Sequence, residues 1–350
     1  MSNGTPSSAD MDLLLQRSTH KTVTQYIVSS ATGDQQLAIL MNAIQCACKV
    51  VSHAIRRAGI SNLYGNSKTT NATGDEVKKL DIVANDIWIH SLRNSGVCCL
   101  LVSEEEEEAL VLNPEEGCPI GPFCVAFDPL DGSSNVDCNV SVGSIFSVYR
   151  RKTGGPCASS EDIVRPGTEI VAAGYSMYGA ATELVITTGM GQPVERFQLD
   201  PSVGEFMFIE YIKFPADGGK KIYSCNEGNS KHWDQGLLDF VQHCKDRSYT
   251  ARYVGSMVSD VHRSLLYGGI FFYPADKKST KGKLRVLYEG FPMAMITENA
   301  GGAASTGMFQ GKIGRVLEVS PEKIHDRCPI IMGCQRDVSL LLQMIQDAKA

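Results

Sequence analysis

The chain has 350 residues, of which 43% are apolar and 21% charged, a composition typical of a soluble globular protein large enough for two domains. Its net charge of −6 argues against a nucleic-acid-binding protein, which needs a basic face. We expect no membrane partner, because the first residues lack the apolar core of a signal peptide and no apolar run approaches the ~18 residues that span a bilayer.

The N-terminal part of the chain is predicted to be helical. A first helix is expected over 11–29, and a second opens at Thr32 and stops at Gly59, since its apolar residues recur every three or four positions. The polar loop 60–74 is expected to be mobile, and a further helix follows over 76–95.

Strands dominate the next part of the chain. The apolar runs 97–102 and 123–127 predict buried strands, and both stop where acidic residues begin. Alternation of apolar and polar residues predicts an extended β region beyond them, within 138–151, 168–176, 182–188 and 194–199.

A basic, glycine-containing segment around 213–221 predicts a domain boundary, which divides the chain into 1–212 and 213–350. Helices and strands then alternate, which indicates an α/β protein layered around mixed sheets. The predicted elements are helices near 234–245 and 257–266, a strand at 270–273, a helix leading to Gly301, and a terminal helix capped by Asp337.

The most informative stretch is 128–135, Asp-Pro-Leu-Asp-Gly-Ser-Ser-Asn, which directly follows an apolar strand. The Pro-Leu turn brings the carboxylates of Asp128 and Asp131 together, and carboxylates bind Mg²⁺ while leaving positions for a substrate phosphate. The turn from Gly132 through Ser133 and Ser134 offers N–H and hydroxyl groups to phosphate oxygens. A polar surface turn is the plainer interpretation, but the strand before it and the Ser-Ser-Asn after it favour a metal-dependent phosphate site.

Five consecutive glutamates follow the strand 97–102. Such a run usually forms a solvated face, and we expect this of Glu106–Glu108. Glu104 and Glu105 differ because they lie at the end of a strand, where ligands bind in α/β sheets. They could converge with the carboxylates of the 128–135 stretch, and such a density of negative charge predicts more than one metal ion.

With these motifs the chain resembles the fructose-1,6-bisphosphatases over nearly its whole length, from about residue 20. The Asp-Pro-Leu-Asp-Gly block alone is shared with inositol phosphatases, whereas the other blocks together are specific to the bisphosphatases. The matching blocks are Thr73–Asp81, Leu101–Glu105, Phe127–Asn135, Ala251–Met257, Tyr273–Lys278 and Lys283–Glu289. The resemblance implies the sugar phosphatase fold, a layered αβαβα sandwich of mixed sheets in two domains. It also implies hydrolysis of the 1-phosphate of fructose 1,6-bisphosphate in gluconeogenesis.

The resemblance implies roles for individual residues. Mg²⁺, two or three ions per subunit with Mn²⁺ or Zn²⁺ as alternatives, would be held by Glu104, Asp128, Asp131, Glu289 and the carbonyl of Leu130. Asp81 and Glu105 would activate the attacking water, and Asp75 would join a further metal when the loop 60–79 closes. The substrate would contact Ser133, Ser134, Asn226, Arg252, Tyr253, Gly255, Ser256, Met257, Tyr273 and Lys283. Arg252 would reach a neighbouring subunit of a homotetramer. The plainer interpretation of the basic residues in this part of the chain is a solvated loop, and we expect it to hold for most of them, with Lys283 the exception. These residues are Lys277, Lys278, Lys281, Lys283 and Arg285.

Members of this family are inhibited by AMP, whose phosphate lies on a helix N-terminus. The matching residues are Thr32, Gly33, Asp34, Gln36 and Arg150, and an ordinary helix cap is the alternative for the first four. Three features depart from the family pattern: Asn229 stands where a phosphate-pocket tyrosine is usual, Pro122 and Phe123 replace a Lys-Tyr pair, and the chain before Thr32 is a few residues short. We therefore expect AMP binding in altered form.

Twelve cysteines without any C-x-x-C spacing indicate apolar filler in a reducing compartment. We expect a cytoplasmic protein; a peroxisome-type organelle is the alternative, although the C-terminal Ala-Lys-Ala is an incomplete address. Other functions left open are a sedoheptulose bisphosphatase, an inositol-type monophosphatase and a catalytically dead phosphosugar sensor.

Overall fold

A computed structural model describes residues 21–29, 33–70, 76–112, 121–155 and 157–349. Two residues singled out from the sequence, Thr32 and Asp75, lie outside the described residues, as does the stretch 11–20 of the first predicted helix. Its described part is the helix α2 (Val23–Ser29).

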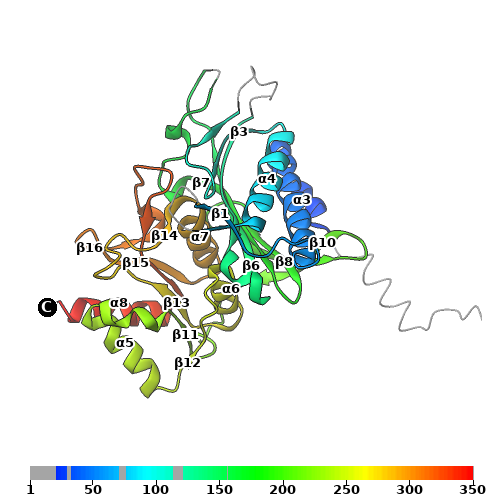
Figure 1. Ribbon diagram of the computed structural model, residues 1–350. Helices are drawn as coiled ribbons and strands as arrows, with labels where there is room; N and C mark the ends of the chain where they lie inside the picture. Colours follow the sequence, from blue (N-terminus) through cyan, green and yellow to red (C-terminus); the bar gives the residue numbers. More distant parts are fainter. Residues whose placement is uncertain (1–20, 30–32, 71–75, 113–120, 156, 350) are drawn as a thin grey trace, which may run out of the picture.

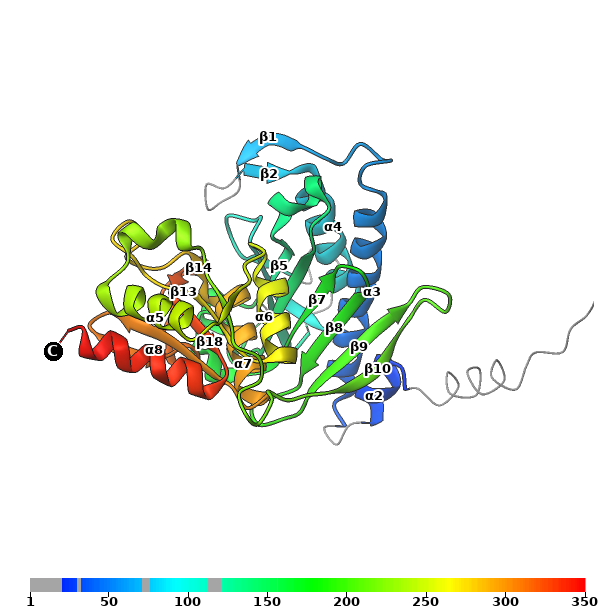
Figure 2. The ribbon, with the colours of Figure 1, turned by 90° about the horizontal axis from the view of Figure 1, so that it is seen from below.

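Helices and sheets alternate in layers (Figure 1, Figure 2). Helices α3 (Gln35–Arg57) and α4 (Lys79–Asn94) cover one face of the first sheet. Between the two sheets lie α6 (Met257–Tyr267) and α7 (Phe291–Asn299). The outer face of the second sheet is covered by α5 (Gln235–Asp246) and α8 (Gln335–Asp347). The predicted α/β class and its αβαβα layering are therefore confirmed.

The first sheet has eight strands in the order β10-β9-β8-β7-β6-β5-β3-β4. Only the β3–β5 pair is parallel among its pairings. The strands are β3 (Cys98–Ser103), β4 (Leu110–Val111), β5 (Phe123–Asp131), β6 (Val142–Arg150), β7 (Ile170–Tyr178), β8 (Thr182–Thr187), β9 (Val194–Asp200) and β10 (Glu205–Ile212). Because β3 and β5 run side by side in one direction, their carboxyl ends, and the acidic residues there, share one edge of the sheet.

The second sheet has six strands in the order β12-β11-β13-β18-β15-β16. They are β11 (Ile222–Ser224), β12 (Thr250–Ala251), β13 (Ile270–Tyr273), β15 (Ala303–Phe309), β16 (Lys312–Arg315) and β18 (Ile330–Gly333). A separate pair, β14 (Leu284–Arg285) with β17 (Arg327–Cys328), is antiparallel. The segment 213–221, which joins the two sheets, contains no helix or strand.

Two local predictions are wrong. The loop 60–74 contains the strand β1 (Asn66–Thr70), which pairs with β2 (Glu76–Lys78), so the following helix begins at Lys79 and not at 76. The terminal helix is not capped by Asp337: its N-cap is Cys334. Asp337 is buried in the first turn, where its carboxylate accepts hydrogen bonds from Tyr249 and Arg336. A carboxylate that is already bonded to these two side chains is not available to cap the helix.

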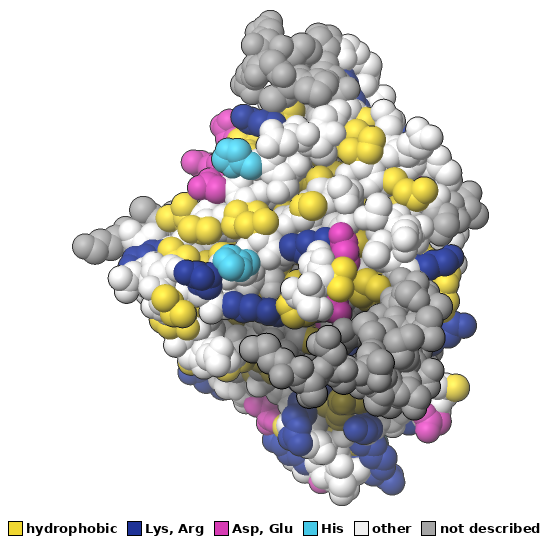
Figure 3. Space-filling view, turned by 90° about the vertical axis from the view of Figure 1, so that its right-hand side faces the viewer, with side chains coloured by type: hydrophobic (Ala, Val, Ile, Leu, Met, Phe, Trp, Pro, Cys, Tyr) yellow, Lys and Arg dark blue, Asp and Glu magenta, His cyan; other side chains and the backbone are white. Residues whose placement is uncertain are grey.

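Helix α3 is the one described helix that is long and apolar enough to cross a bilayer. Its apolar side, with Leu40, Ile44 and Val51, is buried in the core beneath the first sheet. Its Lys49 forms an ion pair with Glu205 at 2.9 Å. Figure 3 shows the side of the molecule on which α3 lies, where hydrophobic side chains are interspersed with Lys and Arg. A helix with one buried apolar side and one side that carries charged residues is typical of a core helix packed on a sheet.

Candidate active site

A bulge in β5 brings Asp128 and Asp131 to the same side of the strand. Asp128 lies opposite Ile145 on β6 and Asp131 opposite Gly143, so three steps along β5 match two along β6. In a regular strand residues three apart face opposite sides, and one extra residue corrects this. The strand therefore continues through the Pro-Leu dipeptide, for which the sequence predicted a turn. Proline is tolerated there because a bulge leaves a ladder position unpaired.

The two aspartates form a buried acidic cluster with Glu289, and carboxylate oxygens of the three lie within 4.8 Å of one another. Glu289 belongs to a π-helical turn, η6 (Val286–Gly290), which leads into α7. The backbone N–H of Arg285 donates a hydrogen bond of 2.5 Å to its Oε2. Such π turns recur at functional sites, because the wider turn redirects a side chain.

Burial and mutual repulsion disfavour the ionised forms of these acids. The pKa of Asp131 is raised by burial to about 6 and that of Glu289 to about 8. Burial, and then the charges of Glu104, Asp131 and Glu289, also raise the pKa of Asp128. A divalent cation would relieve this cost, and a donor set made of oxygens is the one that Mg²⁺ prefers. The residues present therefore fit such an ion.

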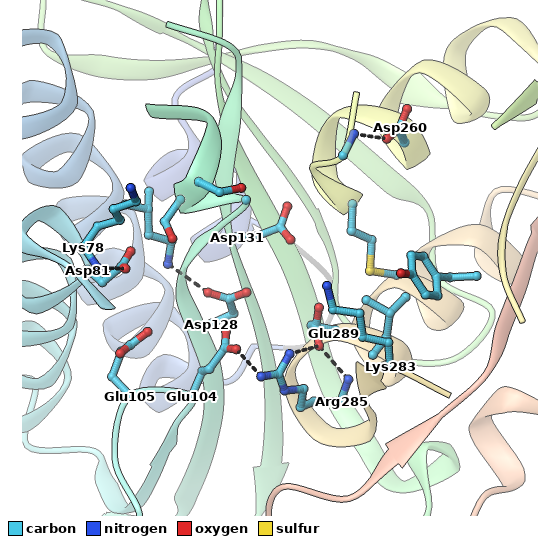
Figure 4. A pocket seen from close by; sticks show the side chains of 18 of the residues that line it. Lys78, Asp81, Glu104, Glu105, Asp128, Asp131, Asp260, Lys283, Arg285 and Glu289 are labelled. Carbon is cyan, nitrogen blue, oxygen red and sulfur yellow. Dashed lines mark hydrogen bonds and ion pairs between the residues drawn. The ribbon is translucent and has the colours of Figure 1, made fainter. Parts of the chain in front are cut away.

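The side chain of Arg285 lies between Glu104 and Glu289 (Figure 4). Its Nη2 lies 2.9 Å from Oε1 of Glu104, and its Nη1 lies 3.9 Å from Oε2 of Glu289. The expectation that most of the basic residues in 277–285 are a solvated loop is wrong for Arg285, which is buried. The sequence does carry a signal for the burial of Arg285, since it stands in an apolar block, 284–289, that ends in the predicted metal ligand Glu289.

Asp81 and Glu105 line the same cavity as the cluster, and Figure 4 shows them on the side away from Lys283. Asp81 is buried in the first turn of α4, where its Oδ2 accepts a 2.7 Å hydrogen bond from the backbone N–H of Lys78. Burial raises its pKa to about 7. A carboxylate that titrates near neutral pH is suited to accept a proton from water.

The glutamate run is a turn, not a helix. Glu107 and Glu108 are exposed, as expected. Glu106 is not simply solvated: its Oε1 accepts a 2.7 Å hydrogen bond from Asn85, whose Oδ1 accepts another from Ser103. These bonds attach the turn that carries Glu104 and Glu105 to α4, and the prediction for Glu106 is wrong for that reason.

Ser133 and Ser134 line the cavity at the start of a short 3₁₀ helix, η2 (Ser133–Cys138). Gly132 before it has φ +74°, and a Cβ there would lie 2.7 Å from the Cβ of Ser256. Only glycine fits this position. Ser256 itself is buried, and its hydroxyl donates to Oδ2 of Asp131 at 2.9 Å.

The opposite wall of the cavity carries the remaining predicted contacts. This wall is lined by Tyr253, Gly255, Met257, Tyr273 and Lys283, whereas Leu130 lines the cavity from β5, between the two aspartates. The Nζ of Lys283 lies 5.9 Å from the ring centroid of Tyr273. Asn229, where the family pattern has a tyrosine, donates a 3.2 Å hydrogen bond to the Tyr273 hydroxyl. The cavity has a volume of about 380 Å³, which suits a small phosphorylated molecule.

Three predicted substrate contacts, Asn226, Arg252 and Ser256, are not among the residues that line this cavity. Asn226 lines a neighbouring pocket with Asn229 and Tyr273, and its side chain accepts a bond from the N–H of Gly228. Arg252 lines a second cavity of about 510 Å³, together with Lys220 and Lys221.

At the predicted AMP position, the described residues form an ordinary helix cap, with Asp34 as the N-cap of α3. Oδ1 of Asp34 accepts hydrogen bonds of 3.1 Å from the N–H groups of Gln36 and Leu37. Its other oxygen pairs with the guanidinium of Arg150. Gly33 precedes this cap with φ +55°.

Buried acids that call for divalent cations, placed beside a turn of hydroxyl groups, suit one class of enzyme, the metal-dependent phosphomonoesterases. The family model described as "Fructose-1-6-bisphosphatase, N-terminal domain" matches residues 21–211, and the model of the C-terminal domain matches 216–346. The chain belongs to the fructose-1,6-bisphosphatase family.

Individual relatives agree. The chain is 48% identical over 338 residues to fructose-1,6-bisphosphatase isozyme 2 of Bos taurus, covering 94% of this chain and 96% of the relative. It is 48% identical to the cytosolic fructose-1,6-bisphosphatase of Oryza sativa subsp. indica, covering 91% and 93%. The crystal structure of Leishmania major fructose-1,6-bisphosphatase in holo form superposes with a TM-score of 0.86 at 43% identity, covering 94% of this chain and 99% of that one.

Proposed function

We propose that this protein hydrolyses the 1-phosphate of fructose 1,6-bisphosphate to give fructose 6-phosphate and inorganic phosphate, as a step of gluconeogenesis. One observation carries the proposal beyond family membership. The cavity that holds the acidic cluster also holds, on its opposite wall, Tyr253, Tyr273 and Lys283. A substrate with a single phosphate has no need of a cation on that wall, whereas a bisphosphate does.

The reacting phosphate is proposed to lie between the acidic cluster and the turn that carries Ser133 and Ser134, whose hydroxyl groups line the cavity there. Mg²⁺, two or three ions per subunit held by Glu104, Asp128, Asp131, Glu289 and the Leu130 carbonyl, would neutralise the phosphoryl oxygens and the leaving oxygen of the sugar. Mn²⁺ or Zn²⁺ would bind the same oxygens.

Proton transfer is assigned to Asp81 and Glu105. Asp81 is the better placed, because its pKa of about 7 keeps it partly ionised at neutral pH and still basic enough to take a proton from water. The backbone N–H of Lys78 and the side chain of Ser133 both interact with the Asp81 carboxylate, which holds it beside the turn proposed to bind the reacting phosphate. Asp75 is proposed to join this group from the loop 60–79.

Sugar and second phosphate are proposed to contact the wall opposite. Gly255, Ser256 and Met257 would lie along the sugar, and Asn226, Tyr253, Tyr273 and Lys283 would hold the 6-phosphate. Lys283 is exposed and lines the cavity, so it can approach a ligand without breaking a buried contact.

Arg252 is proposed to serve the cavity of a second copy of the chain in a homotetramer. Its side chain is exposed, and its Nη1 donates only to the carbonyl of Ala251 among the described residues. A guanidinium that faces outward and lacks a carboxylate partner there is free to meet a phosphate across an interface.

The function is tested by phosphate release from fructose 1,6-bisphosphate, sedoheptulose bisphosphate and inositol monophosphate, each with and without Mg²⁺. We expect Mg²⁺-dependent release, fastest from fructose 1,6-bisphosphate. Preference for either of the other two substrates would replace the proposal with that activity, and no release from any of them would point to a phosphosugar sensor.

AMP inhibition in altered form is proposed as the regulation. Arg150 supports it, as does the N-terminus of α3 at Gly33, Asp34 and Gln36. The carboxylate of Asp34 occupies that terminus and would compete with the nucleotide phosphate. Asp34→Asn keeps a capping oxygen but removes the charge, so we expect it to be inhibited at lower AMP concentration than the wild type. Absence of inhibition in both at millimolar AMP would remove the proposal.

We propose that the two domains divide between residues 212 and 213, which the irregular segment 213–221 supports. The protein is proposed to act in the cytoplasm; relatives from rice carry the name cytosolic.

A further inference from the structure

A single buried carboxylate organises the irregular segment 252–256, which runs from β12 to α6. Asp260, in α6, is fully buried. Its oxygens accept hydrogen bonds of 3.0 Å from the backbone N–H of Val254 and of 3.1 Å from that of Gly255. Both donors precede the N-cap of α6, Ser256, so the carboxylate reaches back beyond the helix that carries it. Asp260 lines the acidic cavity, and Figure 4 shows it apart from the other labelled acids.

Arg263, one turn further along α6, completes this arrangement. One atom, its Nη2, donates to Oδ1 of Asp260 at 2.7 Å and to the backbone carbonyl of Arg252 at 2.9 Å. The N–H of Arg252 donates in turn to the carbonyl of Tyr223 on β11. Both backbone polar groups of Arg252 are therefore fixed, one by α6 and the other by the second sheet.

The segment held in this way separates two cavities. Tyr253 and Gly255 line the acidic cavity, together with Asp260 itself. Arg252 lines the second cavity, together with Arg263. Gly255 has φ +82°, a backbone conformation that glycine adopts readily and other residues rarely. A small rotation of this backbone would move Tyr253 and Arg252 together.

We propose that Asp260 and Arg263 are positioning residues for the second phosphate of the substrate. They contact no substrate themselves; they fix the backbone from which Tyr253 and Arg252 project toward it. The inference rests on the proposed bisphosphatase function. A simpler role, in which the pair only stabilises α6, predicts equal losses for every substrate, whereas positioning predicts a loss confined to substrates that carry a second phosphate.

Two conservative variants separate these roles. Arg263→Lys keeps a cation near Asp260, but an ammonium on a flexible stem does not reproduce the planar guanidinium that reaches both acceptors. Asp260→Asn keeps the size of the side chain and presents an amide N–H₂ to the backbone donors. Loss of a hydrogen bond of this kind corresponds to roughly tenfold in affinity, so we expect the KM for fructose 1,6-bisphosphate to rise about tenfold with kcat changed less than about threefold.

Fructose 1-phosphate, which lacks the second phosphate, is the diagnostic substrate. We expect its kcat/KM to be unchanged within about twofold in Arg263→Lys, which keeps the charges around the acidic cluster. Asp260→Asn also removes a charge that acts on Asp131, so its loss with fructose 1,6-bisphosphate is expected to exceed its loss with fructose 1-phosphate by about tenfold. The matched control is Arg315→Lys, since Arg315 also pairs with carboxylates, Glu298 and Glu318, but lines neither cavity. Equal losses with both substrates would overturn the proposal, and so would an unchanged KM for the bisphosphate.

Equilibrium binding keeps the inference testable if turnover fails. Calorimetric titration with fructose 6-phosphate should give a dissociation constant about tenfold weaker for Arg263→Lys than for the wild type. The same affinity in both would contradict positioning even in an active enzyme. Absence of phosphate release from fructose 1,6-bisphosphate by the wild type would instead contradict the proposed function. Folding of each variant is checked by circular dichroism and by its thermal shift with Mg²⁺.

Discussion

Replacing Asp128 by asparagine should stabilise the metal-free protein while abolishing its activity. Asp128 is buried, and its carboxylate oxygen lies within 4.8 Å of oxygens of Asp131 and Glu289. At an effective dielectric constant of about 20, two unit charges at this separation repel by roughly 3 kcal/mol. Partial protonation already relieves some of this repulsion. Asp128→Asn should therefore raise the stability of the metal-free protein at pH 8 by about 1–3 kcal/mol, or a few degrees in Tm.

The effect of Mg²⁺ should have the opposite sign. An ion that binds only the folded wild type at a hundred times its Kd stabilises that protein by about 2.7 kcal/mol, and the variant should lose most of this gain. Turnover should fall by at least about 100-fold, since loss of an outer-shell partner of a metal alone costs about 10–100-fold.

The assay is thermal unfolding at pH 8 in EDTA and in Mg²⁺, followed by circular dichroism. Asp239→Asn, an exposed residue of α5, is the control for the change in net charge. A variant that melts below the wild type in EDTA would refute the reasoning, because the carboxylate would then be stabilising without any cation.

Four further outcomes are expected. Activity should rise as the pH increases through about 7, where Asp81 ionises, and Asp81→Asn should lower kcat by about 10²–10⁴-fold and remove this dependence; a retained dependence would assign it to another group. The raised pKa values of Asp131 and Glu289, about 6 and 8, mean that folding costs more as these acids ionise. The free energy of unfolding of the metal-free protein should therefore fall as the pH rises from about 4 to 8. Denaturant titrations at several pH values should show a weaker dependence on pH when Mg²⁺ is present. Lys283→Met should raise the KM for the bisphosphate by about 10–100-fold with little change in kcat, whereas Lys277→Met, exposed in the same loop, should not. Gly132→Ala should destabilise the protein by about 1–2 kcal/mol or more, since it adds both left-handed strain and a contact of 2.7 Å; a melting temperature equal to that of the wild type would contradict this.

The sequence was most informative where the chemistry is local. The layered α/β class, helices α3 and α4, and the strands that lead into the acidic residues were all predictable from periodicity. The stretch 128–135 was recognisable as a phosphate site because strand, carboxylates and hydroxyls follow one another directly.

The distant half of the site was accessible only through family resemblance. Glu289 lies 158 residues beyond Asp131, and nothing in local spacing predicts that a π-helical turn brings it within reach. Arg285 was misjudged because a cation in a basic loop is usually solvated, and its burial depends on contacts from the first sheet. The β1–β2 hairpin was missed because polar strands carry no apolar alternation.

Asp337 shows a different kind of limit. Acidic residues are common both as helix caps and in the first turn of a helix. The choice between these positions depends on the partners that the fold supplies, here Tyr249 and Arg336.

The bulge at Pro129 and Leu130 means that the chemistry of this protein depends on the register of β5 against β6 as well as on which residues are present. If β5 and β6 were paired regularly over this stretch, three steps against three with no bulge, one of the two carboxylates would turn to the far side of the sheet, although every acid would still be present. Comparisons of distant relatives that score only which residues match would miss such a change, whereas the register between β5 and β6 would reveal it at once.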